Sequence, residues 1–513
     1  MLSFQENIRK FLTTYPLFST CLLGAIGSLA FAPFHFTFLL IPSFCGLLYL
    51  LRYVKNPKEA FILGLSFGFG HFVTGTFWVA VSFTKVGLTY LMPLGVLGFA
   101  LLLSIFPAIA CALTAYYQRN ILQQALLFSV FWSLSEWTRG HILTGFPWNL
   151  VGYAWDLPML QVCAWIGIYG LSFLTILAST IWMTGSRILM ICTLTIGTLL
   201  WTAGSYRAEK GNLLGNTGIN IRIVQPSVKQ EIKWSPEYAE RNVKLHIALS
   251  QLEAERPLNA IIWPEAAVPL FLESNPQLRE QINEAIPPGA YLLTGAPRKE
   301  QITNDRDNEI SIWSSLFVLN SQGQILATYD KTHLVPFGEY VPFRNILPIE
   351  KLTAGTIDYR PGAKLETIEI NGIPPFSPLI CYEAIFPGKV IDPETTPKWL
   401  LNITNDAWYG HTNGPYQHLA IVRVRAIEEG IPLVRAANNG ISTVVDAYGK
   451  ILYRLELDEI GFIDFDLPRA LMKKTFYNTW REFPFVFMII IILLVSYCTR
   501  NRKCNVDVER PKT

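Results

Sequence analysis

The sequence contains few charged residues. Only 16% of its 513 residues are Asp, Glu, Lys or Arg, against about 25% in soluble globular proteins. Charge is scarce from about residue 11 to 204 and returns to an ordinary density until about 482. The formal net charge is +3, so the composition excludes the strongly basic surface of a general nucleic-acid-binding protein. The uneven charge predicts a membrane protein with one soluble domain.

The charged part of the chain also lacks a pair of cysteines. Cys381 is its only cysteine, and the other seven lie in apolar runs or in the tail: Cys21, Cys45, Cys111, Cys163, Cys192, Cys498 and Cys504. Cys381 therefore has no partner for a disulfide within that domain and no CxxC companion for zinc. The sequence shows no Walker loop and no convincing metal cluster, and His411 and His418 suit structural roles. We expect neither a cofactor nor a metal.

The part of the chain with few charges, from about residue 11 to 204, contains long apolar runs. A membrane-spanning helix needs about 20 largely apolar residues. That length predicts eight spans, near 16–34, 36–52, 60–82, 91–115, 120–137, 160–184, 187–204 and 484–499. Most Lys and Arg of the short loops fall on the inside if the N-terminus is cytoplasmic. We therefore expect a membrane domain at 1–204 with seven transmembrane helices, an outward-facing domain at 205–483, an eighth helix at 484–499 and a cytoplasmic tail at 500–513.

The outward-facing domain alternates apolar strands with helices. Strands are predicted at 219–228, 259–265, 290–297, 377–384 and 399–408, and a hairpin turns at Ser321-Gln322-Gly323. One helix begins at Ser235-Pro236, and another runs from Pro415 to Gly430. Several strands are almost wholly apolar and so are buried on both faces. This pattern predicts an α/β domain with a layered sheet core.

Three reactive side chains follow predicted strands in this domain. Cys381 follows the apolar run PLI, Glu265 ends IIWPE, and Lys331 ends the second strand of the hairpin. Taken singly, Cys381 suits a small buried hydrophobic residue, and Glu265 and Lys331 suit surface charges. Together they form a set for acyl transfer, because a thiol needs a base or a nearby cation to become nucleophilic.

The motifs around these residues resemble the nitrilase, or carbon–nitrogen hydrolase, superfamily. They are WPE at 263–265, DKTHLVPFGEYVP at 330–342 and ICYE at 380–383. The resemblance implies an αββα sandwich with Glu265 as general base, Lys331 as oxyanion stabiliser and Cys381 as nucleophile. Glu339 matches a second acid of the family pattern.

The membrane part narrows the resemblance to the apolipoprotein N-acyltransferases. Supporting stretches are EWTRGHILTGFPWNLVGYAW at 136–155, NITNDAWYG at 402–410 and the segment 415–442. By position in such motifs, four more residues resemble the surroundings of the active site: Trp234, Tyr382, Glu383 and Trp408. The resemblance implies a multi-pass bacterial inner-membrane enzyme whose catalytic domain lies in the periplasm. Its implied substrates are a membrane phospholipid as acyl donor and diacylglyceryl-modified apolipoproteins as acceptors.

Two other functions fit parts of the sequence. A membrane-tethered amidase or nitrilase would use the same triad and release an acid, but one anchoring helix would serve it. A transporter with an outward sensing domain should carry ionisable residues along its spans. The few candidates are His71, Lys85, Glu136 and Arg139, mostly near span ends. Apolar segments at Leu270–Leu272, Phe343 and Ile346–Leu347 are candidates for contact with lipid.

Overall fold

The computed structural model describes residues 2–118, 120–304, 307–346, 351 and 357–499. Contacts divide the chain into two compact units. The helical unit comprises Met1–Phe77, Val96–Ala203 and Trp480–Thr513, and the sandwich unit comprises Trp78–Gly95 and Gly204–Thr479. Cys504 of the predicted cytoplasmic tail and Leu347 of the predicted lipid contacts lie outside the described residues.

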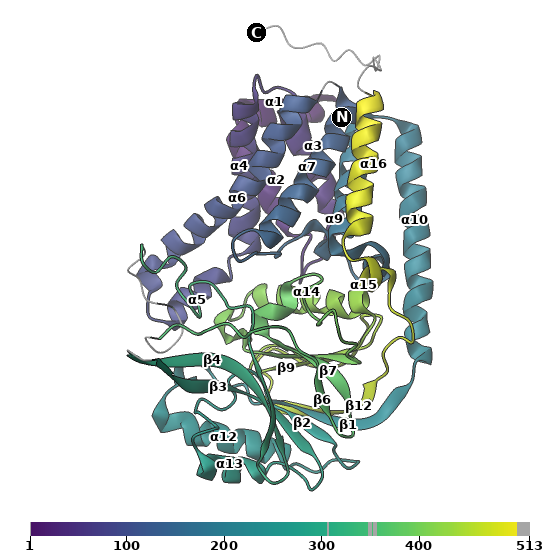
Figure 1. Cartoon of the computed structure of the whole chain (residues 1–513). Helices are drawn as coiled ribbons and strands as arrows, with labels where there is room; N and C mark the ends of the chain where they lie inside the picture. Colours follow the sequence, from purple (N-terminus) through teal and green to yellow (C-terminus); the bar gives the residue numbers. More distant parts are fainter. Residues whose placement is uncertain (1, 119, 305–306, 347–350, 352–356, 500–513) are drawn as a thin grey trace. The chain divides into compact units, whose positions relative to one another are not determined.

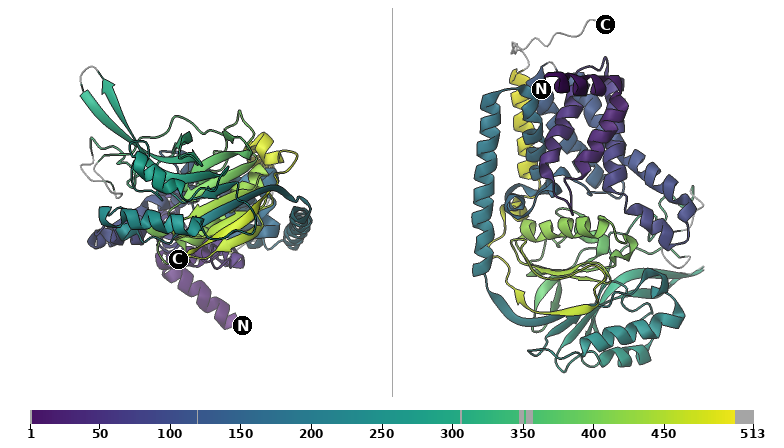
Figure 2. Two further views of the ribbon diagram at one scale, coloured as in Figure 1. Left: turned by 90° about the horizontal axis from the view of Figure 1, so that it is seen from below. Right: turned by 180° about the vertical axis from the view of Figure 1, so that it is seen from behind.

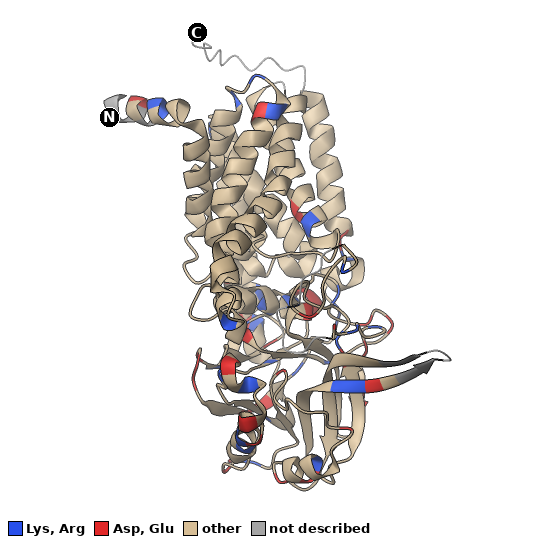
Figure 3. Ribbon diagram, turned by 90° about the vertical axis from the view of Figure 1, so that its left-hand side faces the viewer, with Lys and Arg blue, Asp and Glu red and all other residues tan. Residues whose placement is uncertain are grey.

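The helical unit consists of apolar helices with few charged side chains (Figures 1 and 3). Its helices are α1 (Leu2–Thr14), α2 (Pro16–Ser28), α3 (Leu40–Leu51), α4 (Pro57–Gly75), α6 (Met92–Tyr117), α7 (Ile121–His141), α8 (Leu157–Leu160), α9 (Cys163–Thr180), α10 (Arg187–Glu209) and α16 (Phe483–Thr499). Within the described residues, three helical segments are long and apolar enough to cross a membrane, or four if one bent pair counts as a span. The number of eight crossings stays a prediction.

The bent pair lies within the third predicted span. Helix α4 ends at Gly75, and after a bend of 52° the chain continues as α5 (Val79–Lys85). Helix α5 belongs to the sandwich unit, whereas the sequence boundary at residue 204 assigned it to the membrane domain. This segment has protein partners in that unit: the ring of Trp78, directly before α5, packs at 4.6 Å from the Tyr409 ring, and Val81 of α5 lies beside Gly410.

Two of the ionisable residues considered for a transport path hold a loop inside the helical unit. Glu136 accepts hydrogen bonds from the indole of Trp132 at 3.2 Å and the amide of Val151 at 3.0 Å. Arg139 donates to the carbonyls of Phe146 and Trp148 at 2.8 and 2.6 Å. These partners give both charged groups a structural role.

The sandwich unit contains two six-stranded sheets. The first has the strand order β12 (Gly461–Pro468), β1 (Asn216–Gln225), β2 (Ala260–Ile262), β3 (Tyr291–Asn304), β4 (Asp307–Asn320) and β5 (Ile325–Asp330). The second has the order β11 (Ile451–Leu455), β10 (Ser442–Val445), β9 (Leu433–Ala437), β8 (Trp399–Thr404), β7 (Ile373–Ile380) and β6 (Ile368–Ile370).

Helices cover the outer faces of the two sheets (Figures 1 and 2). On β2, Ile262 packs into the core between the sheets, whereas its neighbour Ile261 packs with Val243 of α12 (Pro236–Ser250) and Leu278 of α13 (Pro276–Asn283). On the second sheet, Leu400 packs in the same way against α14 (Gly414–Glu429). Both faces of the strands are therefore buried, which explains their continuous apolar sequences. The predicted αββα sandwich is confirmed.

The predicted strands and helices occur in the structure. The strands that precede Cys381 and Asp406 end earlier than predicted. The runs 377–384 and 399–408 stop being strands at Ile380 and Thr404, where the 3-10 helices η6 (Cys381–Ile385) and η7 (Asp406–Trp408) follow. Helix α14 ends as predicted, because Gly430 adopts the left-handed conformation at φ 71° that closes a helix.

Candidate active site

The three predicted catalytic residues lie just beyond the ends of strands. Glu265 follows β2 by three residues, Lys331 follows β5 directly, and Cys381 follows β7 directly. Strands β2 and β5 belong to one sheet and β7 to the other, and Cys381 is part of the core between them. The two sheets therefore bring together residues that are 116 positions apart in sequence between Glu265 and Cys381.

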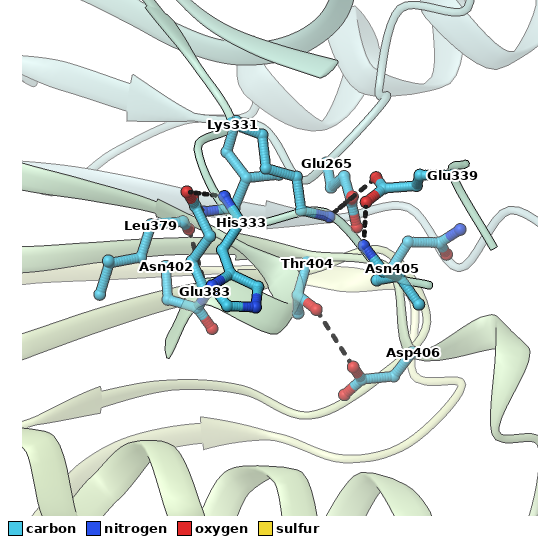
Figure 4. Close-up of polar contacts among 12 residues, drawn as sticks. Glu265, Lys331, His333, Glu339, Leu379, Glu383, Asn402, Thr404, Asn405 and Asp406 are labelled. Carbon is cyan, nitrogen blue, oxygen red and sulfur yellow. Dashed lines mark hydrogen bonds and ion pairs between the residues drawn. The ribbon is translucent and has the colours of Figure 1, made fainter. Parts of the chain in front are cut away.

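Lys331 lies between two carboxylates (Figure 4). Its Nζ is 2.8 Å from Glu339 Oε1 and 3.6 Å from Glu265 Oε1. Glu339 is fixed in turn, because its other oxygen accepts the amide of Val335 at 2.7 Å. Only 1% of the Lys331 side chain is exposed, so its cation has protein partners in place of water.

Cys381 and the residue after Glu265 have unusual backbone conformations. The φ angles are +52° at Cys381 and +47° at Ala266, although neither residue is glycine. Such conformations cost about 1–3 kcal/mol and concentrate at functional sites. Gly295 of β3 permits the turn at Glu265, since a Cβ there would lie 2.8 Å from the Glu265 Cα. The backbone therefore brings both side chains to one place, where the Glu265 carboxyl and the Cys381 thiol shift each other's pKa.

Burial governs the protonation of this group. It raises the pKa of the Cys381 thiol to about 12, and the Glu265 charge adds to the effect while Lys331 opposes it. Burial also raises the pKa of Glu265, against the opposing charge of Lys331. For Lys331, burial lowers the pKa, but Glu339 and Glu265 outweigh it and the pKa lies above its ordinary value. The resting nucleophile is therefore a thiol beside a carboxylate of increased basicity, which is an arrangement for general-base activation.

Glu383 contacts the backbone of both turns that carry the reactive groups. One oxygen accepts the amides of Thr332 and His333 at 2.7 and 3.2 Å, and the other accepts the amide of Ile380 at 2.7 Å. The hydroxyls of Tyr329 and Thr332 also donate to it, at 2.8 and 2.7 Å. Glu383 thus positions the neighbours of Lys331 and Cys381.

The three predicted aromatic residues lie at different places around this group. Tyr382 packs against the rings of Phe386 and His333, at 5.1 and 5.7 Å. Trp408 lies in η7, and Trp234 follows α11 (Gln230–Lys233). Their contribution to the site stays a prediction.

Helix α5 contacts both tryptophan-bearing segments. Ser82 donates a hydrogen bond to the carbonyl of Trp408 at 3.2 Å. Lys85 forms an ion pair of 2.7 Å with Glu231 of α11. Lys85, considered above for a transport path, therefore stabilises the surroundings of the site.

Lys233 is a residue near the site that the sequence reasoning missed. It is 3% exposed, and its Nζ donates to the backbone carbonyl of Glu265 at 2.8 Å. In the sequence, only its position directly before Trp234 could have indicated that Lys233 lies near the site.

A second missed group supports Cys381 from the neighbouring strand. Ile380 lies opposite Ile403 in the parallel pairing of β7 and β8, so Thr404 follows beside Cys381. The Thr404 hydroxyl donates a hydrogen bond to Asp406 Oδ1 at 3.1 Å, and it lowers the pKa of the Cys381 thiol against the larger effect of burial. Asp406 is buried with Arg435 at 2.6 Å and His418 at 3.0 Å. His418 thus has the structural role expected for it, whereas His411 lies in an exposed ion pair with Asp458.

No group of three or more His, Cys, Asp or Glu side chains in the described part of the chain is arranged to hold a metal ion. The chemistry available at Cys381 is that of a thiol, two carboxylates and a buried ammonium group.

Two family models match the chain in succession. The apolipoprotein N-acyltransferase N-terminal domain matches residues 23–181, and carbon–nitrogen hydrolase matches residues 220–477. Among solved structures, an amidase from Nesterenkonia sp. is similar with 18% identity and a TM-score of 0.35, covering 50% of this chain and 92% of that one.

Full-length relatives cover both parts. The apolipoprotein N-acyltransferase of Rickettsia prowazekii is 38% identical over 489 residues, 93% of this chain and 97% of that protein. The apolipoprotein N-acyltransferase of Rhodopseudomonas palustris is 34% identical over 501 residues, 92% of this chain and 93% of that protein. The chain therefore belongs to the apolipoprotein N-acyltransferase family.

Proposed function

We propose that Cys381 carries the acyl group in the N-acyltransferase reaction that this enzyme shares with its family. The observation that carries the assignment is the group of Glu265, Lys331 and Cys381, in which Lys331 Nζ lies 3.6 Å from Glu265 Oε1 and both charged groups act on the pKa of the thiol. It provides a nucleophile, a base and a cation at one place.

In the first half-reaction, Glu265 removes the thiol proton and the sulfur of Cys381 attacks an ester carbonyl of a membrane phospholipid. Lys331, together with backbone N–H groups, stabilises the negative charge on the carbonyl oxygen. The ester C–O bond then breaks, and the leaving alkoxide takes the proton from Glu265. A lysophospholipid departs, and a thioester remains on Cys381.

In the second half-reaction, the α-amino group of the acceptor attacks the thioester. The acceptor is the diacylglyceryl-modified N-terminal cysteine of an apolipoprotein. Glu265 takes a proton from the attacking nitrogen and returns it to the departing sulfur. The products are an amide and the regenerated thiol. An amide is more stable than a thioester, so this step completes the transfer.

The substrates place this reaction at a membrane. The enzyme is a membrane protein of a family that acts on lipoproteins with phospholipid as donor. We assign residues 1–204 to the membrane domain with seven helices, 484–499 to the eighth helix, 500–513 to the cytoplasm, and 205–483 to the periplasmic side of the inner membrane. The excess of Lys and Arg in the predicted inside loops supports this orientation.

Exposed apolar side chains of the sandwich unit support contact with lipid. Phe343 is 66% exposed and Ile346 is 76% exposed, and both follow the segment that contains Lys331 and Glu339. Leu270 is 37% exposed, but Leu272 is fully buried in the core and is removed from the predicted lipid contacts.

The assignment is tested with the purified full-length protein and a phospholipid labelled in its acyl chain. Wild type should form a protein adduct that hydroxylamine releases, as thioesters require, and Cys381→Ala should form none. Cys192→Ala is the matched control, because Cys192 is an exposed free cysteine of α10. An adduct that persists in Cys381→Ala would overturn the assignment. Release of labelled fatty acid to water without transfer to an amine would favour the amidase alternative.

A further inference from the structure

Lys233 is a buried cation that the proposed mechanism does not use. It ends the short helix α11 and is 3% exposed. Its Nζ donates to the carbonyl of Glu265 at 2.8 Å, directly before the turn at Ala266, which has φ +47°. A buried ammonium group is costly unless it is paired and hydrogen-bonded, so its partners indicate what it is there to do.

The groups that face Lys233 come from four elements. Glu265 follows β2, Cys381 begins η6, and His246 lies on α12. Glu231, on the same short helix, is paired with Lys85. Burial lowers the pKa of Lys233 to about 8, while the charges of Glu265 and Cys381 oppose that shift. Burial lowers the pKa of His246 to about 4, so His246 is neutral at pH 7 and adds no charge.

The balance of charge around Cys381 depends on Lys233. Three carboxylates, Glu265, Glu339 and Glu383, act on Lys331 or on the turns beside it. Asp406 is separately paired with Arg435. Lys233 and Lys331 are the two ammonium groups beside these carboxylates, so without Lys233 only Lys331 opposes their negative charge. A larger buried negative charge disfavours a further anion and so raises the pKa at which the thiol loses its proton.

We propose that Lys233 is a positioning residue for the acyl transfer, which holds the general base Glu265 by its backbone and supplies the second positive charge that makes the Cys381 thiolate accessible. The inference rests on the proposed function, because it assigns Glu265 as the base. Lys233 acts through Glu265 and through its field, without contact with the acyl group.

The test is the rate of Cys381 alkylation by iodoacetamide at pH 7 in the full-length protein. At this pH Lys233 is charged, and the rate reports the small thiolate fraction without any acyl transfer. Lys233→Met and Lys233→Gln should both lower the rate about tenfold or more, which corresponds to one pH unit in the pKa of the thiol. Lys233→Arg keeps the charge and should stay near the wild-type rate. Lys229→Met is the matched control, because Lys229 lies four residues earlier and is exposed.

The double variant Lys233→Met/Glu339→Gln separates charge from structure. Removing one carboxylate offsets the lost positive charge, so the alkylation rate at pH 7 should return toward that of wild type. A wild-type alkylation rate for Lys233→Gln, which keeps a donor for the Glu265 carbonyl, would reduce Lys233 to a backbone contact and overturn the proposal. If Lys233→Met does not fold, the pair Lys233→Gln and Lys233→Arg gives the same decision. Failure of the proposed function would appear separately, as alkylation of Cys381 without any acyl adduct.

Discussion

Glu383 accepts hydrogen bonds from both the amide and the hydroxyl of Thr332, each at 2.7 Å. The same carboxylate accepts the amide of Ile380 at 2.7 Å. It therefore joins the residue after Lys331 to the residue before Cys381, across the two sheets. The distance between cation and nucleophile depends on this one side chain, which is an arrangement that holds catalytic groups in their productive geometry.

Replacing Glu383 by Gln should weaken the protein as well as the reaction. An amide nitrogen would face donors that need an acceptor, and one unsatisfied buried group costs about 1–3 kcal/mol. We expect a lower unfolding temperature and a loss of acyl-adduct formation of at least about tenfold. Glu394→Gln is the control, because Glu394 is exposed. Wild-type stability in Glu383→Gln would show that Glu383 does not hold these turns.

The enzyme should lose stability as the pH falls below about 6.5, partly because of His246. In the folded protein its ring is buried, hydrogen-bonded to the Asn242 carbonyl at 2.7 Å, and its pKa is lowered to about 4. In the unfolded chain the pKa is about 6.5. Because the folded pKa is the lower one, the unfolded state binds more protons between these values. The stabilising contribution is complete above pH 6.5 and falls by about 3 kcal/mol as the pH falls to 4.

The measurement is the unfolding temperature of the full-length protein at pH 7.5 and pH 5.0. His246→Gln should show a smaller difference between the two than wild type. His411→Gln should leave the difference unchanged, because 81% of the His411 side chain is exposed. Burial and Arg435 also lower the pKa of His418, so part of the pH dependence should remain in His246→Gln. An identical pH dependence in His246→Gln and wild type would contradict the assignment.

The sequence predicted that Glu265, Lys331 and Cys381 follow strands, and the structure places each of them just beyond a strand end. An apolar strand that is followed at once by Glu, Lys or Cys places that residue at the edge of a sheet, and three such edges meet in a sandwich. Lys233 gave no such signal. It lies on a four-residue helix within a charged stretch, which resembles an exposed segment, and only the folded chain brings it to the Glu265 carbonyl.

The apolar run at residues 60–82 shows a second limit of sequence reasoning. A high hydropathy indicates that side chains are removed from water, but it does not distinguish burial in lipid from burial in protein. Trp78 and Val81 of this run contact Tyr409 and Gly410 of the sandwich unit. Contacts group residues 78–95 with the sandwich unit, although these residues come before residue 204 in the sequence.

The exposed residues Phe343 and Ile346 should matter only when the acyl donor is in a bilayer. Exposed apolar side chains of this size suit burial in the interface of a membrane. We expect Phe343→Ser/Ile346→Ser to slow adduct formation from phospholipid vesicles several-fold while Cys381 alkylation by iodoacetamide keeps its wild-type rate. Leu252→Ser is the control, because Leu252 is 48% exposed and follows α12. An unchanged rate with vesicles would exclude these residues from lipid contact.

Glu265 and Lys331 should fail in different ways when each is replaced. In the proposed mechanism Glu265 removes the thiol proton, so Glu265→Gln should slow acylation by about 10²–10⁴. Its remaining activity should increase toward high pH, where hydroxide replaces the base, because burial holds the pKa of Cys381 at about 12. In the proposed mechanism Lys331 stabilises the oxyanion through its charge, so Lys331→Met should depress both half-reactions at every pH.

Lys331→Arg decides whether the position of that charge matters. Lys331 Nζ lies 2.8 Å from Glu339 and 3.6 Å from Glu265, and the Lys331 side chain is 1% exposed. A guanidinium group is wider than an ammonium group and directs its donors differently, so Lys331→Arg should recover little activity. The measurement is single-turnover acylation by labelled phospholipid across pH, followed by transfer to an amine acceptor. A nearly normal rate in Lys331→Arg would make Lys331 a distant countercharge, and normal acylation in Glu265→Gln would transfer the role of base to Glu339 or Glu383.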